Sequence, residues 1–441
     1  MNKTIEKIVS LCKRRGFIFQ SSDIYGGFSA IYDYGPLGIE LKNNISQLWW
    51  KDMTQVHENI VGLDSGILMH PKIWEASGHL GAFNDPLVDC KQCKSRYRAD
   101  EFSEDYASID WQSIQCPNCG TTGSFTEPRQ FNLMFKTHVG PMEESGTEAF
   151  LRPETAQGIY VNYQLVQGAM RMKVPFGIAQ IGKAFRNEIV ARNFIFRTRE
   201  FEQMEMQYFV KPGTDDDILN QWKDKRLNFY LEKLDIEKNK LRYHEHDDSE
   251  LAHYAKEAWD IEYDFPFGWS EIEGIHNRTD FDLSRHQEFS GKNLSYFDQP
   301  INERYLPYII ETSAGLNRML LTVLADAYWE DDDNNRTVMK FHPRLAPVKA
   351  VICPLTKKDG LPEKAREVLE ILKPHFKVIY DQQGSIGKRY YRQDEAGTPF
   401  GITVDHESLE DNTVTLRDRD SMKQDRISID QLLTAIQDNI I

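Results

Sequence analysis

The segment from Ile178 to Phe209, IAQIGKAFRNEIVARNFIFRTREFEQMEMQYF, constrains the fold of this chain more than any other. Residues 178–185 are rich in apolar side chains, and residues 201–209 alternate between apolar and polar side chains, which predicts a strand, a charged loop and a returning strand. The arginines of the loop region are Arg186, Arg192, Arg197 and Arg199. Because guanidinium groups bind phosphate through paired, charge-assisted hydrogen bonds, the hairpin predicts an anion site. A solvated hairpin tip with weak surface ion pairs is the alternative.

The length and charge of the chain bound its organisation. Its 441 residues exceed what one hydrophobic core usually holds, so we expect at least two domains. With 40% apolar residues and no apolar run of membrane length, we expect a globular chain without a membrane partner. The net charge is −15, and the excess acid lies before residue 340, because residues 340–441 are neutral overall. An RNA partner would have to bind local basic patches against an unfavourable overall field.

Two helices are predicted near the N-terminus. The start, MNKTIEKIVSLCKRRGF, is amphipathic and has no small-residue cleavage site, which favours a cytoplasmic location; an organelle-targeting segment is the alternative. Glycines and Pro36 then mark a turn, and apolar side chains recur at helical spacing from Leu37 to Trp49. Trp49 and Trp50 suit a buried interface, although an ordinary packed helix explains the same spacing.

Four cysteines form two close pairs. Cys90 and Cys93, like Cys116 and Cys119, have the spacing C-x-x-C. Close thiol pairs in a cytosolic chain favour tetrahedral zinc over disulfides, so we predict a structural Zn²⁺ site. A ribbon that is held by packing and keeps free thiols is the alternative.

Acidic side chains mark the middle of the chain. Glu154 lies in RPETAQG, ahead of a predicted helix that Gly158 and Gly168 are expected to break. An acid at a helix start is favourable in its own right, which is the alternative to a binding role for Glu154. Residues 212–264 are acidic and predict a solvated, peripheral helical layer, including a helix over SELAHYAKEAWDIEY.

Two later segments place charged side chains on regular elements. Residues 265–286 include a predicted strand with Glu271 and Glu273; Glu273 is given no site role, and a solvated strand face is its alternative. Residues 304–330 predict an apolar strand, a turn of small residues and an apolar helix with Arg318 in its first turn. Because the helix dipole disfavours a cation there, we expect an anion or a stacked base beside Arg318.

A domain boundary is predicted near residue 340, where an acidic run and prolines precede a new pattern. Strands then alternate with helices, which indicates a compact α/β domain with a mixed sheet. One of its helices combines cations with aromatic rings that suit nucleic-acid binding, namely Lys388, Arg389, Tyr390, Tyr391 and Arg392. Burial of the two tyrosines in that domain is the alternative.

Several short segments resemble one enzyme family. FRNE with REFEQ in the arginine hairpin, and GLNR at Arg318, are similar to the second and third signature motifs of class II aminoacyl-tRNA synthetases. YDYGPLG with ELKNN resembles the first motif, and RPETAQG narrows the resemblance to the homodimeric (α2) glycyl type. The resemblance covers nearly the whole chain, and its motifs follow the order of the family.

This resemblance implies an α+β fold, with an antiparallel sheet flanked by helices and a C-terminal α/β domain of the anticodon-binding type. The catalytic domain would span residues 1–339, with a cysteine-containing insert at 88–125 and a helical insert at 212–262. The anticodon-binding domain would span residues 340–441. The first motif would lie at a two-fold dimer interface.

The resemblance also implies roles for individual residues. Arg186 and Arg318 would be catalytic, and Phe201 and Arg318 would cover the two faces of the adenine. The ATP site would comprise Arg186, Asn187, Glu188, Phe196, Arg197, Phe201, Glu271, Ile272, Gly315 and Arg318. The glycine site would comprise Arg98, Glu154, Phe201, Gln203, Glu205, Glu311, Ser313 and Gly315.

The implied activity is a ligase that uses ATP and Mg²⁺ to convert glycine to glycyl-adenylate and transfers glycine to the 3′ end of its tRNA. No editing domain is expected, because every competing amino acid is larger than glycine. Two other functions remain as alternatives: a non-enzymatic, DNA-binding relative such as the accessory subunit of mitochondrial DNA polymerase, and an adenylating relative without tRNA. The ATP-site residues argue against the first, and the C-terminal domain argues against the second.

Overall fold

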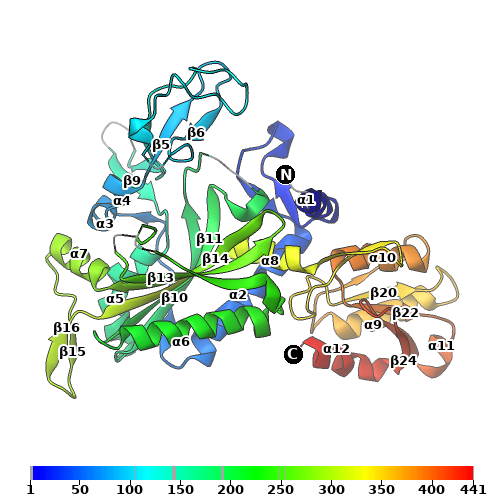
Figure 1. Cartoon of the computed structure of the whole chain (residues 1–441). Coiled ribbons are helices and arrows are strands. Elements are labelled where there is room, and N and C mark those ends of the chain that lie inside the picture. The colour runs from blue at the N-terminus through cyan, green and yellow to red at the C-terminus, as the bar shows by residue number, and fades with distance from the viewer. Residues whose placement is uncertain are drawn as a thin grey trace.

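The computed structural model describes residues 3–103, 105–141, 146–189, 193–247, 249–252 and 254–440. Figure 1 shows a larger body built on a twisted sheet, a knob above it, and a smaller body that contains the C-terminus. Within the described residues, no helix is long and apolar enough to cross a membrane.

The larger body is organised around a sheet whose described strands run in the order β12-β13-β14-β17-β11-β10-β3. Neighbouring strands are antiparallel, except for the parallel pair β10 and β3. The predicted hairpin is confirmed as β10 (Phe176–Phe185) and β11 (Glu200–Val210). The other strands are β3 (Ile60–Gly62), β12 (Leu241–Glu245), β13 (Glu257–Phe265), β14 (Gly268–Thr279) and β17 (Tyr308–Gly315).

Helices cover both faces of this sheet (Figure 1). They are α1 (Lys3–Arg15), α2 (Pro36–Lys51), α5 (Ala156–Met170), α6 (Asp215–Asn228), α7 (Phe281–Ser290) and α8 (Leu316–Ala327). α1, α2, α6 and α8 share the largest hydrophobic core with one face, around Trp49, Met206 and Leu320. α5 and α7 enclose a second core on the other face, around Tyr163 and Phe209. Burial of this apolar surface on both faces fixes the sheet that carries the arginine hairpin.

Three sequence predictions in this body need correction. α5 runs unbroken through Gly158 and Gly168, and a Cβ at Gly158 would collide with the Ser65 side chain, so that glycine permits close packing. The second half of the predicted helical insert is wrong, because Glu257–Phe265 is β13, paired with β12 and β14. Trp49 is fully buried in the chain's own core, which leaves it no part in an interface.

Glu273, which was given no role from the sequence, is buried. It is 1% exposed on β14 rather than on a solvated face. The Nε of Arg226 on α6 donates to Glu273 Oε1 at 2.6 Å, and its Nη1 lies 3.3 Å from Asp52 Oδ2. Because Arg226 has no exposed surface, each of these charges depends on its partner for compensation.

The knob and the layer below it carry two small sheets. In the knob, β5 (Asn84–Asp89) lies between β6 (Arg96–Arg98) and β7 (Arg129–Asn132). The layer below has β9 (Thr147–Leu151) between β4 (Leu68–Met69) and β8 (Lys136–Val139). Shorter elements are β1 (Ile18–Gln20), β2 (Tyr32–Tyr34), α3 (Pro71–Ala76), α4 (His79–Ala82), β15 (Tyr296–Asp298) and β16 (Glu303–Tyr305).

The smaller body has the predicted mixed sheet, with the described order β21-β20-β22-β23-β24. β20 is parallel to β21 and β22, and the remaining pairs are antiparallel. Its strands are β20 (Ala350–Pro354), β21 (Val378–Tyr380), β22 (Phe400–Val404), β23 (Thr413–Asp418) and β24 (Gln424–Ser428). Its helices are α9 (Leu361–Leu372), α10 (Ile386–Ala396), α11 (Glu407–Asp411) and α12 (Leu432–Ile440).

A hairpin of β18 (Tyr328–Asp331) and β19 (Arg336–Met339) follows α8 and joins the two bodies. Arg336 Nε lies 2.7 Å from Asp331 Oδ2, and its Nη1 lies 2.8 Å from Asp394 Oδ2 on α10. Arg417 Nη1 on β23 lies 2.9 Å from Asp394 Oδ1. All of these side chains are buried, so a charge network with satisfied partners crosses the junction.

Candidate active site

A cleft with about 620 Å³ of free space opens where β10 and β11 reach their connecting loop. Its walls also include the strand β14, the end of β17 and the first turn of α8. The predicted site residues that line it are Arg186, Glu188, Phe196, Arg197, Phe201, Gln203, Glu271, Ser313, Gly315 and Arg318. The fold therefore brings together residues that lie up to 132 positions apart in the sequence.

Arg186 lies between aromatic rings in this cleft. Its guanidinium carbon is 5.3 Å from the ring centroid of Phe201 and 5.4 Å from that of Phe83. Its Nε donates to the Pro153 carbonyl at 3.0 Å, and its main-chain N–H donates to the Arg199 carbonyl. These contacts fix the plane of the guanidinium group, which suits a fork that receives two anionic oxygens.

Arg318 forms the opposite wall. Its Nη1 lies 2.9 Å from Glu271 Oε2, and its Nε donates to the Phe196 carbonyl at 3.3 Å. The guanidinium carbon is also 4.4 Å from the centroid of the Phe196 ring. The Arg318 charge lowers the pKa of Glu271. The anion that the helix dipole predicts beside Arg318 is therefore present within the chain as the Glu271 carboxylate.

The mouth of the cleft carries further charges from the hairpin loop. Arg197 Nη1 lies 4.0 Å from Glu188 Oε2, and its side chain is 41% exposed. Arg199 Nε donates to the Glu188 carbonyl at 3.0 Å. Arg192, also predicted for this loop, lies outside the described residues. The described mouth therefore has guanidinium groups beside a carboxylate that can accept hydrogen bonds.

A buried acidic pocket adjoins the cleft at Gln203. Gln203 Nε2 donates to Ser313 Oγ at 3.3 Å, and its Oε1 accepts from the Thr155 N–H at 3.1 Å. Gln207 Nε2 donates to Glu205 Oε1 at 2.8 Å and to Glu311 Oε1 at 2.9 Å. The acidic side chains of this pocket are Glu154, Glu205 and Glu311.

The three acids have different pKa shifts. Burial, with the charges of Glu311 and Glu154, raises the pKa of Glu205 well above its usual range. Burial acts the same way on Glu311, but Arg278 and His276 outweigh it and hold the pKa of Glu311 well below its usual range. Against burial, His79 and Arg278 lower the pKa of Glu154 to about 2. These shifts therefore favour the charged forms of Glu154 and Glu311 and the neutral form of Glu205.

Sequence reasoning missed the residues that surround these acids. Arg278 Nη1 lies 3.2 Å from Glu311 Oε2, and its Nε lies 2.8 Å from Asp282 Oδ2. His276 Nδ1 lies 2.8 Å from the same Glu311 oxygen. The spacing of His276 and Arg278, two positions apart on a predicted strand, places both on one face and could have identified them.

His79 has a similar position on the other side of the acidic pocket. Its Nε2 lies 3.4 Å from Glu154 Oε2, and its Nδ1 lies 2.8 Å from Ser77 Oγ. His79 therefore holds one end of the Glu154 carboxylate, and Gln157 Nε2 donates to the other oxygen at 2.9 Å.

Among the described residues, three predicted ATP- or glycine-site residues lie neither in the cleft lining nor in the acidic pocket. Arg98 on β6 pairs with Asp85 and Asp100 at 3.1 and 2.6 Å. The Asn187 N–H donates to the Leu133 carbonyl at 2.7 Å. Ile272 is fully buried in the main hydrophobic core.

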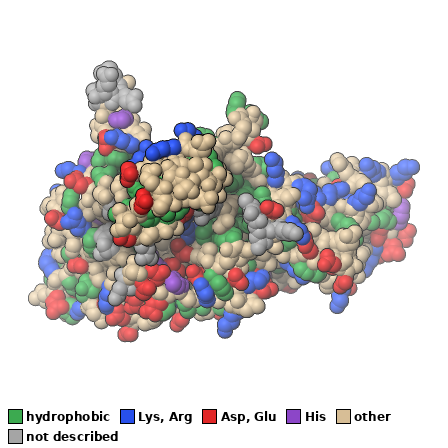
Figure 2. Space-filling view, turned by 45° about the horizontal axis from the view of Figure 1, so that its top comes forward, with side chains coloured by type: hydrophobic (Ala, Val, Ile, Leu, Met, Phe, Trp, Pro, Cys, Tyr) green, Lys and Arg blue, Asp and Glu red, His purple; other side chains and the backbone are tan. Residues whose placement is uncertain are grey.

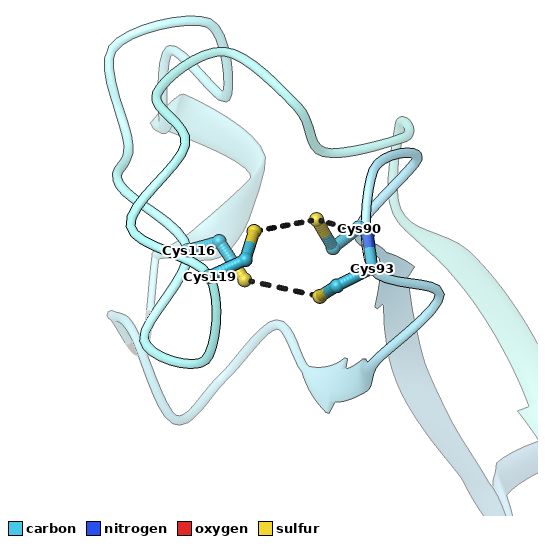
Figure 3. Close-up of side chains that lie close together, drawn as sticks. All are labelled: Cys90, Cys93, Cys116 and Cys119. Atoms are coloured by element: carbon cyan, nitrogen blue, oxygen red, sulfur yellow. Dashed lines mark hydrogen bonds between the residues drawn. The ribbon is translucent and has the colours of Figure 1, made fainter.

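The four predicted metal-ligating cysteines converge in the knob (Figure 3). Their sulfur atoms all lie within 4.8 Å of one another, although the two pairs are far apart in sequence. Cys90 Sγ is 3.7 Å from Cys119 Sγ, and Cys93 Sγ is 3.7 Å from Cys116 Sγ. Hydrogen bonds from Ser95 and Asn118 lower the pKa of Cys93 to about 5, which favours the thiolate that binds metal. This donor set fits a tetrahedral zinc ion.

The candidate nucleic-acid contacts on α10 divide into two groups. Arg389 is buried and donates to the Pro354 carbonyl at 2.6 Å, and Tyr390 is buried beside Thr403. Tyr391 is exposed, and Arg392 Nη2 lies 2.6 Å from Asp381 Oδ2 at a partly exposed position. Arg389 and Tyr390 therefore stabilise the domain, and only the second group faces outward.

Comparisons with known proteins agree with this geometry. Residues 135–327 match the family described as the tRNA synthetase class II core domain (G, H, P, S and T). Residues 349–439 match the family described as the anticodon binding domain. The fold and the site thus define a class II aminoacyl-tRNA synthetase, and the predicted α+β fold class is confirmed.

Full-length relatives narrow the class further. The glycine–tRNA ligase of Treponema denticola is 61% identical over 99% of this chain and 97% of its own length. The glycine–tRNA ligase of Borrelia hermsii is 56% identical over 99% of this chain and 98% of its own length. That of Thermobifida fusca is 52% identical over 98% of this chain and 97% of its own length. The chain therefore belongs to the glycine–tRNA ligase family.

Proposed function

We propose that this protein activates glycine with ATP to form glycyl-adenylate and then transfers glycine to the 3′ end of its cognate tRNA. The carrying observation is a link between the arginine-lined cleft and the buried acids: Gln203 lines the cleft and accepts a hydrogen bond from the N–H of Thr155, whose hydroxyl donates to Glu205. A nucleotide triphosphate fits the cleft by charge, and a small ammonium group fits the acidic pocket.

ATP would lie in the cleft, with its α-phosphate at Arg186. Phe201 would stack on one face of the adenine and Arg318 would cover the other. Glu188 would accept a hydrogen bond from the exocyclic amino group. The Glu271 carboxylate faces the cleft, and Mg²⁺ bound with ATP would neutralise phosphate charge there.

Glycine would bind with its ammonium group among the three acids and its carboxylate directed at the α-phosphate. A carboxylate oxygen attacks the α-phosphorus, the bond to the leaving pyrophosphate breaks, and glycyl-adenylate forms. A ribose hydroxyl at the 3′ end of tRNA then attacks the carbonyl carbon, and AMP leaves as one proton is released. Positioning and charge stabilisation by Arg186 and Arg318 supply the catalysis, so no nucleophilic side chain is needed.

Selection of glycine would follow from size. The acidic pocket is closed by buried side chains, including Thr155 and Gln207, so an added methyl group has to displace packed atoms. Overpacking of that kind costs about 1–3 kcal/mol, and misplacement of the reacting carboxylate adds to the discrimination.

Three further features belong to this proposal. Cys90, Cys93, Cys116 and Cys119 would hold a structural zinc ion that stabilises the knob. The protein would act as a homodimer in the cytoplasm, and sedimentation at micromolar concentration would give twice the chain mass. The smaller body would bind the anticodon region, and the exposed Tyr391 and Arg392 on α10 are candidate contacts.

The adenylation step is tested by amino-acid-dependent exchange of pyrophosphate into ATP. We expect exchange with glycine and none with alanine or serine. Arg186→Ala should abolish it, whereas Arg366→Ala, an exposed arginine on α9, should leave it unchanged. A folded protein that supports no exchange with any amino acid would instead favour a non-catalytic, nucleic-acid-binding role.

A further inference from the structure

An exposed apolar loop lies beside the mouth of the cleft. It comprises residues 21–31, between β1 and β2, and is called the apolar loop below. Ile24 and Tyr25 are each 87% exposed and Phe28 is 54% exposed. Figure 2 shows the segment as a projection with hydrophobic side chains at its tip. Apolar side chains that gather at one exposed site commonly mark an interaction surface.

The apolar loop has a defined conformation. Its backbone closes on itself, with Phe28 N–H donating to the Ser21 carbonyl at 2.9 Å and Gly27 N–H donating to the Ser22 carbonyl at 3.1 Å. Ser22 and Ala30 adopt left-handed backbone angles, with φ of 58° and 60°. Non-glycine residues rarely adopt this conformation, and it persists where the surrounding contacts enforce it. The exposed side chains are therefore presented at fixed positions.

The arginine hairpin fixes the loop beside the cleft. Arg199 N–H donates to the Ala30 carbonyl at 2.9 Å, and Arg199 Nη1 donates to the Ser29 carbonyl at 3.0 Å. The Arg199 carbonyl in turn accepts from the N–H of Arg186, which lines the cleft. Figure 1 shows the apolar loop (dark blue) and the cysteine knob (cyan) on either side of the loop end of β10 and β11.

We propose that the apolar loop is a stacking platform for the unpaired nucleotides at the acceptor end of tRNA. The proposal rests on the function proposed above, because only a substrate with a single-stranded 3′ end has to pass this mouth. Aromatic side chains stack on unpaired bases of any sequence, and neighbouring cations hold the phosphates. Tyr25 and Phe28 supply the rings, and Arg197 and Lys13 supply exposed cations nearby.

The position of the cations favours RNA over a second copy of the chain as the occupant. Arg199 hydrogen-bonds the apolar loop, and Arg197, two residues earlier in the same hairpin loop, lines the cleft toward which the 3′ end would run. Aromatic rings would stack on the bases of a single RNA strand, and the guanidinium groups beside them would bind its phosphates. A second copy of this chain as partner would not require guanidinium groups beside the rings.

The test compares Tyr25→Ala and Tyr25→Phe with Ile371→Ala, an exposed apolar residue on α9 that serves as the matched control. Three readouts are measured for each variant: glycine-dependent pyrophosphate exchange, kcat/KM for tRNA charging, and oligomeric state by sedimentation. We expect Tyr25→Ala to lower charging by roughly 10- to 100-fold, as loss of one stacked base does, with exchange unchanged. Tyr25→Phe should charge like the wild type, because it keeps the ring.

A second arm locates the contact on the RNA. Binding is compared for intact tRNA and for tRNA that lacks its unpaired 3′ nucleotides. We expect Tyr25→Ala to weaken binding of the intact tRNA only. Three results would overturn the proposal: normal tRNA charging by Tyr25→Ala, equally weakened binding of both RNAs by Tyr25→Ala, and conversion of this variant to monomers. The last result would show that the apolar loop contacts a second subunit instead. Failure of exchange in the wild type would instead refute the proposed function.

Discussion

Glycine binding should release a proton from the acidic pocket. Glu205 is buried between Glu311 and Glu154, and its pKa is raised well above the usual range. The empty pocket therefore favours the neutral form of Glu205, whereas an ammonium group placed among these acids favours its ionised form. The protein should bind glycine more tightly as the pH rises, because ionised Glu205 is the form that glycine prefers.

The magnitude follows from proton linkage. Release of one proton per site changes the glycine dissociation constant by about tenfold per pH unit, which is about 1.4 kcal/mol. The dependence should hold below the folded pKa of Glu205 and disappear above it. Glu205→Gln removes the titrating group, so its glycine affinity should be weaker and should lose this slope. His276 and His79 also face the pocket and remain in the variant, which controls for their titration.

Calorimetric titration with glycine, in two buffers of different ionisation enthalpy, measures the released proton directly.

The wild type and Glu205→Gln also allow a test of how the free energy of unfolding depends on pH. Because the folded pKa of Glu205 is raised, its contribution to stability is fully present below the unfolded pKa of about 4.3 and is lost as the pH rises. Wild type should therefore lose stability relative to Glu205→Gln as the pH rises above the unfolded pKa of about 4.3, until Glu205 ionises in the folded state. No proton release by the wild type, or an equal slope in Glu205→Gln, would refute this reasoning.

Three further predictions concern other parts of the molecule. Glu273→Gln leaves Arg226 buried without its closest partner, so the free energy of unfolding, measured by chemical denaturation, should fall by about 3–5 kcal/mol. A fall below about 1 kcal/mol would contradict the importance of the buried ion pair. Elemental analysis of protein purified without chelator should find one zinc ion per chain in the wild type and none in Cys116→Ser. A wild-type protein without metal would favour the alternative of free thiols. Arg318→Ala should lower exchange by roughly 10²–10³-fold while the melting temperature changes little, and unchanged exchange would remove Arg318 from the site.

Local patterns were sufficient for much of the fold. The alternation in residues 201–209 predicted β11, and helical spacing from Leu37 predicted α2. The paired C-x-x-C spacings predicted the cysteine cluster. In each case the signal lies within one element or one short repeat, where period and spacing are determined by local geometry.

Predictions failed where tertiary contacts override local preference. The helix predicted over SELAHYAKEAWDIEY is wrong at residues 257–265, because pairing with β12 and β14 on both sides makes them the strand β13. The burial of Glu273 was not predicted, because its partner Arg226 lies 47 residues away on α6. The Arg278, His276 and His79 contacts to the acidic pocket were missed for the same reason, since each joins segments that are distant in sequence.

The most direct test of the central claim is attachment of labelled glycine to tRNA by the purified protein with ATP and Mg²⁺, with alanine and serine tested in parallel. We predict that glycine alone becomes esterified to the 3′ end, and that Arg186→Ala abolishes the reaction. Comparable charging with alanine would contradict the glycine pocket. Absence of charging by a folded protein that still binds tRNA would contradict the proposed ligase activity.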